Sequence, residues 1–273
     1  MAATIVLLTD FGLSDPYVAQ MKGAILSRHP DATLVDLSHD IPPFELPRAA
    51  LFLEASRRHF PRGTIFVAVI DPGVGTARRI VALEKDGQTF LAPDNGLLGL
   101  VLAAPGEARS WDLSAHARGD AVSATFHGRD VFAPLAAALG AGEPAADLGP
   151  EIEPAGLTRP PWAEPVPTKN PVGVEVSILH VDHFGNCLTN LPLEPWARRL
   201  PSAAQLIMTP SLGASRAVLR VQTYAQLERA QLGLIPGSQG YLELALNQAS
   251  AASETGLAPG DTLILSTKEA ELR

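Results

Sequence analysis

Two aspartates follow apolar, strand-like runs in the first half of the chain and are candidates for ligand binding. Asp10 lies in LLTDFG, and Asp71 opens the segment DPGVGTARR. Open parallel sheets bind ligands outside the carboxyl ends of their strands. A carboxylate there can accept hydrogen bonds from ribose hydroxyls or hold a cation. Aspartate is also a common helix cap and turn residue, so position alone leaves a functional and a structural interpretation open.

The loop that follows Asp71 combines glycines with basic residues. Gly73 and Gly75 allow tight backbone turns and the close approach of a ligand. Arg78 and Arg79 follow in the same loop, so one guanidinium could fold back onto Asp71. The third glycine of a dinucleotide-binding fingerprint is missing. The alternative to a functional site is a structural salt bridge within the loop, which is a common feature.

A histidine precedes a predicted helix in the middle of the chain. His127 lies in FHGRD, next to Gly128, and the helix pattern begins at Val131. A histidine beside a glycine-containing turn can orient or polarise a water molecule. Because single histidines are more often structural, His127 by itself does not predict a catalytic site.

The segment HVDHFGN in the second half of the chain contains metal-ligand residue types. His180 and Asp182 share a face of a predicted strand, and His183 begins a turn. No further His or Cys cluster accompanies them, so a metal site is not predicted. Asp182 could instead bind a cationic amine, and Asn186 could pair with the donor and acceptor atoms of a base.

A turn of small residues near the C-terminus is a further candidate. Ser238 lies in PGSQG between two predicted strands. Its hydroxyl and the neighbouring backbone N–H groups could bind a carboxylate. A plain hairpin turn is the alternative, and the sequence of the turn alone favours it.

An alternation of strand and helix patterns is expected to position the residues of the first half. Short apolar or β-branched runs predict strands, and apolar residues at helical spacing predict helices. This order predicts an α/β domain over residues 1–150, with a mostly parallel central sheet and helices on both faces. The predicted strands are 4–8, 33–37, 64–70, 79–84 and 89–92, and the predicted helices are 17–28, 47–59, 97–103 and 131–139.

The composition changes after residue 150. Eight prolines lie between positions 144 and 171, and this density disfavours helices and central strands, so residues 151–171 are predicted to be a Pro-rich linker. Residues 172–273 show strand and turn patterns, which predict a smaller β-rich C-terminal domain of sandwich or barrel type. The predicted strands there are 173–182, 205–208, 217–224, 240–246 and 262–266.

Bulk properties exclude several classes of protein. With 46% hydrophobic and 18% charged residues, the 273-residue chain is typical of a globular protein. Its formal net charge of -8 argues against nucleic acid as a partner. Cys187 is the single cysteine, so the chain forms no internal disulfide. Neither a signal peptide nor a membrane-spanning run is expected, and the cytoplasm is the expected location.

Five motifs, in their order and spacing, resemble the SAM hydroxide adenosyltransferase family, the hydrolytic relatives of the bacterial fluorinase and chlorinase. The motifs are LLTDFG, VIDPGVGTARR, PDNG, FHGRDVFAP and HVDHFGN, and the resemblance covers nearly the whole chain. It implies an enzyme that hydrolyses S-adenosyl-L-methionine (SAM) to adenosine and L-methionine. Water or hydroxide attacks C5′ in line with the carbon–sulfur bond, and neither a metal nor another cofactor is needed.

The resemblance also implies roles for residues of the first domain. The family's Asp-Arg-His trio, which positions and polarises the attacking water, corresponds to Asp71, Arg78 and His127. Asp10 corresponds to the aspartate that binds the ribose hydroxyls. Phe44, in IPPFE, corresponds to an aromatic residue that lies against the nucleoside in the halogenases.

In the second domain the resemblance implies contacts to the rest of the substrate. Asp182 corresponds to the residue that contacts the methionine amino group, Asn186 to the residue that recognises adenine, and Ser238 to the serine at the methionine carboxylate. Gln239 departs from an arginine that follows this serine in the fluorinase, so recognition of the carboxylate differs in detail. The resemblance further implies a homotrimer, with substrate between the N-terminal domain of one subunit and the C-terminal domain of the next.

Three other functions stay open at this point. A halogenase would use the same fold and substrate with a halide nucleophile, but the trio disfavours it because a carboxylate beside the nucleophile repels an anion. A protein that binds SAM without cleaving it is a second alternative. A metallohydrolase built on His180, Asp182 and His183 is a third. The physiological role, the turnover rate and the preferred sulfonium stereoisomer are beyond what the sequence predicts.

Overall fold

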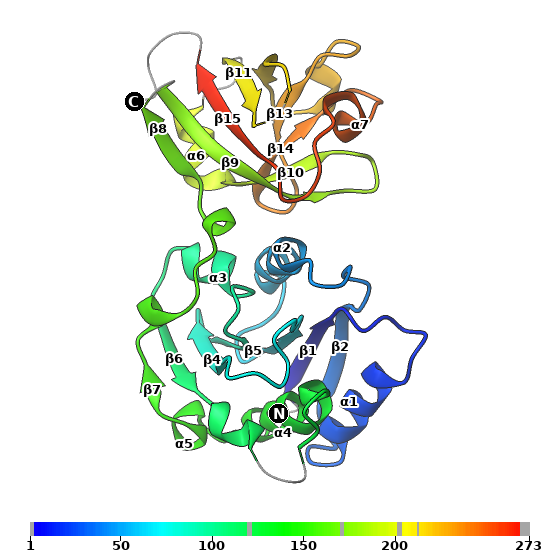
Figure 1. Ribbon diagram of the computed structural model, residues 1–273, viewed down its shortest axis with the longest axis vertical. Coiled ribbons are helices and arrows are strands. Elements are labelled where there is room, and N and C mark those ends of the chain that lie inside the picture. Colours follow the sequence, from blue (N-terminus) through cyan, green and yellow to red (C-terminus); the bar gives the residue numbers. More distant parts are fainter. Residues whose placement is uncertain (1–2, 119–121, 170–171, 201–203, 212, 268–273) are drawn as a thin grey trace. The chain divides into compact units, whose positions relative to one another are not determined.

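A computed structural model of the chain describes residues 3–118, 122–169, 172–200, 204–211 and 213–267 (Figure 1). The chain divides into two compact units, Met1–Pro160 and Pro161–Arg273. This division falls inside the proline-rich segment 151–171. Part of that segment joins the sheet of the first unit as β7 (Glu151–Ile152), and part joins the sheet of the second as β8 (Val166–Lys169).

A seven-stranded sheet forms the centre of the first unit, in the order β2-β1-β3-β5-β4-β6-β7. β2, β1, β3 and β5 run parallel to one another. β1 and β3 are almost entirely buried, as expected for parallel strands that are covered on both faces. The strands are β1 (Thr4–Thr9), β2 (Thr33–Ser38), β3 (Ile65–Val69), β4 (Ile80–Lys85), β5 (Gln88–Pro93), β6 (Ala108–Asp112) and β7.

This sheet is mixed, so the prediction of a mostly parallel central sheet is wrong. β4 pairs antiparallel with β5 and with β6, and β6 pairs antiparallel with β7. The chain reverses between β4 and β5 at Asp86 and Gly87, which have φ angles of 53° and 76°. Two central residues with positive φ form the tight turn that matches the twist of a β-hairpin, and Asp-Gly is a sequence signal for it. The pair therefore forces β4 and β5 to run in opposite directions.

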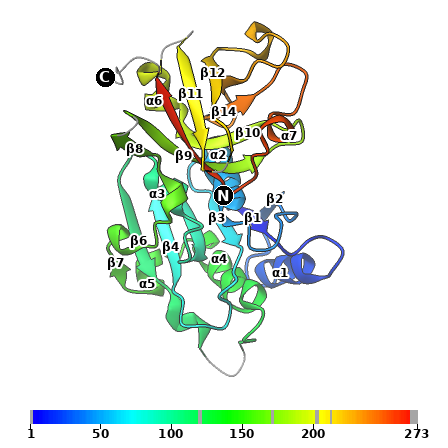
Figure 2. The same cartoon turned by 45° about the horizontal axis from the view of Figure 1, so that its top comes forward.

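Helices cover both faces of the sheet, as predicted. α1 packs with α4 on one face, and α2 packs with α3 on the other (Figures 1 and 2). Ile5 belongs to the apolar cluster on the first face and its neighbour Val6 to the cluster on the second, because successive side chains of a strand point to opposite faces. The helices are α1 (Tyr17–Leu26), α2 (Leu46–Arg57), α3 (Gly99–Ala103), α4 (Ala133–Gly140) and α5 (Ala145–Leu148).

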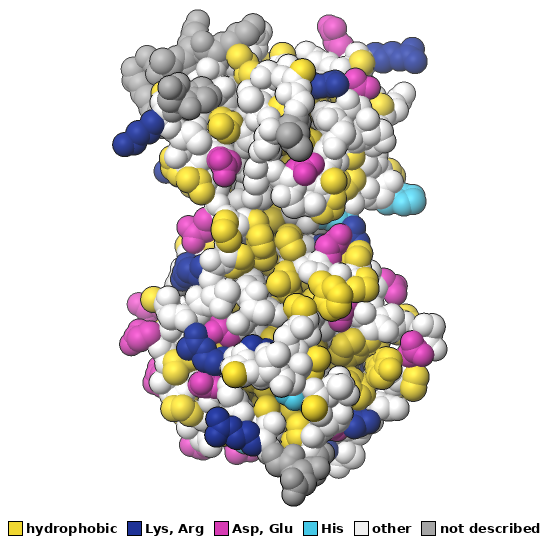
Figure 3. Space-filling model, viewed as in Figure 1, with side chains coloured by type: hydrophobic (Ala, Val, Ile, Leu, Met, Phe, Trp, Pro, Cys, Tyr) yellow, Lys and Arg dark blue, Asp and Glu magenta, His cyan; other side chains and the backbone are white. Residues whose placement is uncertain are grey.

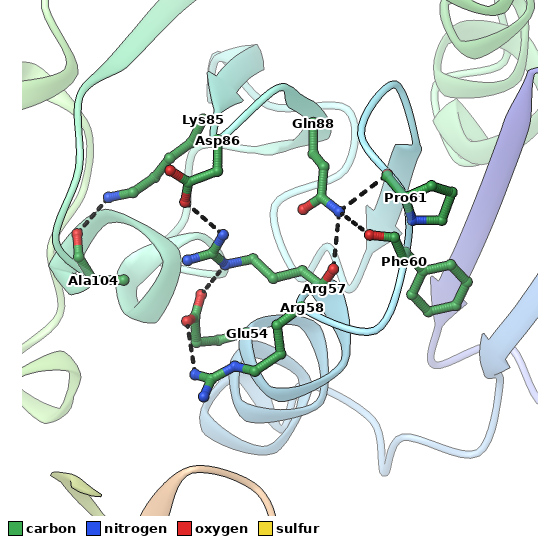
Figure 4. Close-up of polar contacts among 9 residues, drawn as sticks. All are labelled: Glu54, Arg57, Arg58, Phe60, Pro61, Lys85, Asp86, Gln88 and Ala104. Atoms are coloured by element: carbon green, nitrogen blue, oxygen red, sulfur yellow. Dashed lines mark hydrogen bonds and ion pairs between the residues drawn. The ribbon is translucent and has the colours of Figure 1, made fainter. Parts of the chain in front are cut away.

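A polar network joins the end of α2 to the hairpin (Figure 4). The buried Glu54 carboxylate accepts hydrogen bonds from Nε of Arg57 at 2.6 Å and from Nη2 of Arg58 at 3.3 Å. Nη1 of Arg57 donates to Asp86 at 2.7 Å. The Gln88 amide donates to the Arg57 carbonyl at 2.9 Å. Because the last carbonyls of a helix have no partner within it, this side chain completes the C-terminus of α2.

The second unit is a closed barrel, which agrees with the predicted β-rich domain. Seven strands pair in the order β10-β14-β13-β12-β11-β15-β9, and pairing of β9 with β10 closes the ring. Closure leaves no unpaired strand edge in the ring. The strands are β9 (Val172–Val181), β10 (Cys187–Pro192), β11 (Gln205–Pro210), β12 (Arg216–Arg220), β13 (Gly233–Pro236), β14 (Tyr241–Ala245) and β15 (Thr262–Thr267).

A separate apolar cluster fills this barrel, with contributions from α6 (Leu193–Arg199) and α7 (Ala251–Thr255). Cys187 belongs to the cluster and is completely buried. Burial raises the pKa of its thiol to about 12. The single cysteine is therefore part of the core and is not poised as a nucleophile.

The surface agrees with the acidic composition. On the face shown in Figure 3, the described Lys and Arg side chains lie apart from one another among Asp and Glu side chains. In the part of the chain that the structure describes, no helix has the length and apolar character that a membrane span requires.

Candidate active site

The ends of β1 and β3 bring two predicted site residues to the same edge of the first sheet. These strands are parallel neighbours, with Thr9 opposite Val69, so Asp10 and Asp71 follow them side by side. Burial raises the pKa of Asp10 above its ordinary value, the Phe44 backbone N–H partly opposes this, and the nearby charge of Asp71 adds to it. The edge therefore carries two carboxylates that interact electrostatically.

Asp71, Arg78 and His127 form a continuous hydrogen-bonded chain. Nε of Arg78 donates to both carboxylate oxygens of Asp71 at 2.9 Å. Nη2 of Arg78 donates to Oδ2 of Asp71 and, at 2.8 Å, to Nδ1 of His127. The side chains of Arg78 and Asp71 are only 9% and 4% exposed. The guanidinium is therefore fixed between a carboxylate and an imidazole.

The loop between β3 and β4 folds back on itself to place this guanidinium. The Thr76 hydroxyl donates to the Gly73 carbonyl at 2.6 Å, and its oxygen accepts from the Arg78 backbone N–H at 3.4 Å. Gly75 has a φ of 76°, and a Cβ at this position would lie 2.6 Å from the Ala124 carbonyl oxygen. Only glycine fits this turn, which packs the loop against the segment that leads to His127.

His127 lies at the start of a π-helical turn, Gly128–Phe132, that continues into α4. Its side chain is buried, and burial together with the positive charge of Arg78 lowers its pKa. An arginine can only donate hydrogen bonds, so Nδ1 of His127 is an acceptor, and the neutral ring carries its proton on Nε2. His127 therefore offers an N–H donor to the site.

Phe44 lies directly beside Asp10. Its backbone N–H donates to Oδ2 of Asp10 at 3.3 Å. Phe44 has a φ of 69°, an uncommon conformation for a bulky residue, and its side chain is 65% exposed. Strained residues of this kind cluster at binding sites. The first unit thus brings together all five of its predicted site residues.

In the second unit, Asp182 and Asn186 occupy one loop between β9 and β10. Oδ1 of Asp182 accepts from the backbone N–H groups of Phe184 at 2.9 Å and of Asn186 at 2.8 Å. Oδ2 of Asp182 accepts from Nδ2 of Asn186 at 2.9 Å. The two predicted substrate contacts are therefore linked. Among the described residues, no hydrogen bond to Oδ1 of Asn186 is found, so this oxygen can act as an acceptor.

A cavity of about 580 Å³ lies against this loop. Phe184 and Tyr224 supply aromatic walls, and Asn186 supplies a polar group. Phe184 is 76% exposed. Asn247, Gln248 and Ser250 add further polar groups to its lining, beside Leu246 and Ala249. Aromatic walls combined with a few polar side chains are the character expected of a site for a planar base.

Ser238 lies at the exposed tip of the turn between β13 and β14. The Gly237 N–H donates to the Tyr241 carbonyl at 2.8 Å, which closes the hairpin. Among the described residues, no hydrogen bond joins Ser238 to Asp182 or Asn186. The structure thus identifies a hairpin here and leaves the role of Ser238 a prediction.

The structure adds two polar residues that the sequence analysis missed. Glu243 is only 5% exposed, and the Tyr224 hydroxyl donates a hydrogen bond to its carboxylate. The charge of Asp182 contributes to raising the pKa of both groups, after burial. The only signal in the sequence is a charged residue between leucines, and such residues are usually exposed.

His180, Asp182 and His183 were the alternative metal ligands in the sequence. Within the described residues, no group of three or more His, Cys, Asp or Glu side chains is arranged to hold a metal ion. The Asp182 carboxylate is instead occupied by its own loop.

Proteins from several organisms resemble the chain over nearly its full length. An (R)-S-adenosyl-L-methionine hydrolase of Salinispora tropica is 38% identical over 93% of this chain and 94% of its own. The enzyme of the same name from Thermus thermophilus is 39% identical over 94% and 96%. A fluorinase of an Actinoplanes species is 29% identical over 95% and 96%.

Solved structures agree with this similarity. A conserved protein of Thermotoga maritima matches with a TM-score of 0.82 at 29% identity, over 96% of this chain and 99% of its own. A conserved protein of Thermus thermophilus matches with a TM-score of 0.75 at 38% identity, over 97% and 100%. The models of the SAM hydroxide adenosyltransferase N-terminal and C-terminal domains match residues 5–149 and 176–264. The chain therefore belongs to the SAM hydroxide adenosyltransferase family.

Proposed function

We propose that this protein hydrolyses SAM to adenosine and L-methionine. The observation that carries the proposal is the chain of hydrogen bonds from Asp71 through Arg78 to His127. Hydrolases named for this reaction are 37–39% identical to most of the chain. Because those relatives are named for the (R)-sulfonium form, we propose the same stereoisomer as substrate here.

Hydrolysis of SAM requires a correctly positioned nucleophile more than it requires an acid catalyst for the leaving group. The sulfonium already makes methionine a good leaving group, so catalysis consists of holding water in line with the C5′–sulfur bond. Nε2–H of His127 donates to the water oxygen and leaves its other lone pair for attack. Asp71 is the acceptor for the proton that the attacking water loses, and Arg78 stabilises its partial hydroxide character.

The acidic edge of the first unit suits the substrate. Asp10 accepts hydrogen bonds from the ribose hydroxyls, and Phe44 packs against the nucleoside. Asp10 and Asp71 also favour a positively charged sulfonium over an anion. A halide would be repelled at this site, which favours water as nucleophile although a fluorinase is among the relatives.

The finer features of the proposal follow from the family. Asp182, Asn186 and Ser238 bind the methionine amino group, the adenine and the methionine carboxylate. The protein acts as a homotrimer in the cytoplasm, with active sites at subunit interfaces, and it needs neither metal nor other cofactor. The buried free thiol of Cys187 fits a reducing compartment.

The test is product analysis after incubation with SAM in chloride buffer made with water enriched in heavy oxygen. We expect label in the 5′-hydroxyl of adenosine and no effect of a chelator. Formation of 5′-chloroadenosine, or binding of SAM without release of methionine, would contradict the proposal. Arg78→Ala should abolish turnover. Arg79→Ala is the matched control, because Arg79 pairs with Asp94 at 2.7 Å outside the trio.

A further inference from the structure

One strand of the barrel carries a buried glutamate on its outer side. In β14, Leu242 and Leu244 point into the apolar interior. Glu243 lies between them, and because side chains alternate along a strand, it points away from the interior. Its side chain is nevertheless only 5% exposed. Other parts of the second unit therefore cover it.

Two segments lie against the Glu243 carboxylate. The Tyr224 hydroxyl donates a hydrogen bond to Oε1. A Cβ at Gly237 would lie 2.7 Å from Oε2, so the turn that carries Ser238 passes directly beside this oxygen. Tyr224 is the only hydrogen-bond partner of Glu243 among the described residues, and no Lys or Arg in that part of the chain forms an ion pair with it.

A buried carboxylate without a cationic partner is costly. Burial raises the pKa of Glu243, and the negative charge of Asp182 raises it further. The strand register places the two carboxylates on one face: His180 of β9 and Glu243 of β14 both pair with Leu188 of β10, and Asp182 follows His180 by two residues. A single cation bound between them would relieve both the repulsion and the missing partner.

Asp182 cannot satisfy such a cation alone. Three hydrogen bonds from its own loop already occupy its oxygens. A primary ammonium group has three donors and needs acceptors for each of them. Oε2 of Glu243, on the same outer side of the barrel, is a second acidic acceptor.

Resting on the proposed function, we infer that Glu243 is a specificity-determining residue that binds, together with Asp182, the ammonium group of the methionine moiety. Tyr224 is a positioning residue that holds the carboxylate in place. The site then selects sulfonium substrates with an amino acid tail over sulfonium substrates without the amine. The competing explanation is that Glu243 only braces the turn at Gly237.

Steady-state kinetics of the full chain separate these explanations. Glu243→Gln should raise KM for SAM by about tenfold or more, with kcat changed by less than about twofold, because a charge-assisted hydrogen bond is lost from binding. For a SAM analogue that lacks the amino group, the variant and the unmodified protein should have equal KM. Glu175→Gln is the matched control, since Glu175 is an exposed residue of β9 in the same barrel.

An unchanged KM for SAM, or an equal rise for SAM and for the analogue, would overturn the inference, because a brace acts on both substrates alike. Tyr224→Phe keeps the carboxylate and should raise KM for SAM less than Glu243→Gln does. A larger effect of Tyr224→Phe would also overturn it. Calorimetric binding of SAM and of the analogue gives the same comparison without turnover, so absence of adenosine release would count against the proposed function and leave the inference about Glu243 decided by affinity.

Discussion

At the scale of single residues, the imidazole of His127 decides how water can be held. Its Nδ1 atom accepts from Arg78 at 2.8 Å, which leaves Nε2 protonated. In this state His127 orients water as a donor and does not remove a proton. The neutral form is favoured because burial and the charge of Arg78 both lower the pKa of His127.

This assignment predicts an acidic limb in the pH profile of kcat. Protonation of Nδ1 removes the acceptor for Arg78 and places a second cation beside the guanidinium and the sulfonium. Because the pKa of His127 is lowered from 6.5, kcat should be constant from neutral pH to below this value and should fall as the pH drops through the lowered pKa. The measurement is adenosine release at saturating SAM. A fall that begins above the ordinary histidine pKa would contradict the assignment.

Substitution of the same residue provides a second prediction. His127→Ala should lower turnover by about 10²- to 10³-fold, as for loss of one positioned hydrogen-bond donor, while the protein stays folded, as judged by circular dichroism. His59→Ala, at an exposed histidine after α2, is the control and should leave turnover unchanged. If His127 only shapes the turn before α4, its loss would lower stability and leave the turnover of the folded protein close to normal.

The sequence predicted which loop residues belong to the candidate site better than it predicted the side chains with which they pair. The sequence allowed either arginine of the loop to reach Asp71, and the structure shows that Arg78 does so while Arg79 pairs with Asp94. Adjacent side chains in a loop differ in direction only through backbone turns, which the sequence does not specify. The burial of Glu243 was missed for a related reason, since the segments that cover it lie elsewhere in the chain.

At the scale of elements, the spacing of apolar residues predicted single helices and strands better than it predicted how the strands pair. The helix predicted over 17–28 is α1, because its apolar residues recur at the spacing of one buried helix face. The strand predicted over 4–8 is β1, because a continuous apolar run reflects a strand that is buried on both faces. β10 and β13 were missed because prolines and an asparagine interrupt their short apolar runs. Strand direction depends on connections, and the tight Asp86–Gly87 turn makes β4 run antiparallel to β5, which itself runs parallel to β3.

The contact between α2 and the hairpin predicts a stability effect. Glu54→Gln should lower the free energy of unfolding by about 1–3 kcal/mol, because the buried side chain loses the charge that accepts from Arg57 and Arg58. Urea denaturation of the full chain measures this change. Glu151→Gln is the control, since the Glu151–Arg109 pair is exposed, and it should have a much smaller effect. Equal effects of the two substitutions would show that the network in Figure 4 adds nothing to an ordinary surface pair.

At the scale of the whole molecule, the candidate residues divide between two units with separate cores. The first unit holds Asp71, Arg78 and His127, and the second holds Asn186 and Glu243. Under the proposed trimer, each active site takes its first-unit residues from one subunit and its second-unit residues from the next. A site built from two chains can be restored by mixing two chains with complementary defects.

Complementation tests this arrangement directly. Arg78→Ala removes the guanidinium that stabilises the attacking water in the first unit, and Asn186→Ala removes the base-recognising amide of the second, so neither variant should turn over SAM alone. Trimers refolded from an equal mixture should regain about a quarter of the unmodified activity, because one interface in four combines two intact halves. A mixture of Arg78→Ala and His127→Ala is the control and should regain none, since both defects lie in the same unit. If the mixture of Arg78→Ala and Asn186→Ala also stays inactive while size measurements show mixed oligomers, each active site is formed within a single chain and the proposed interface is wrong.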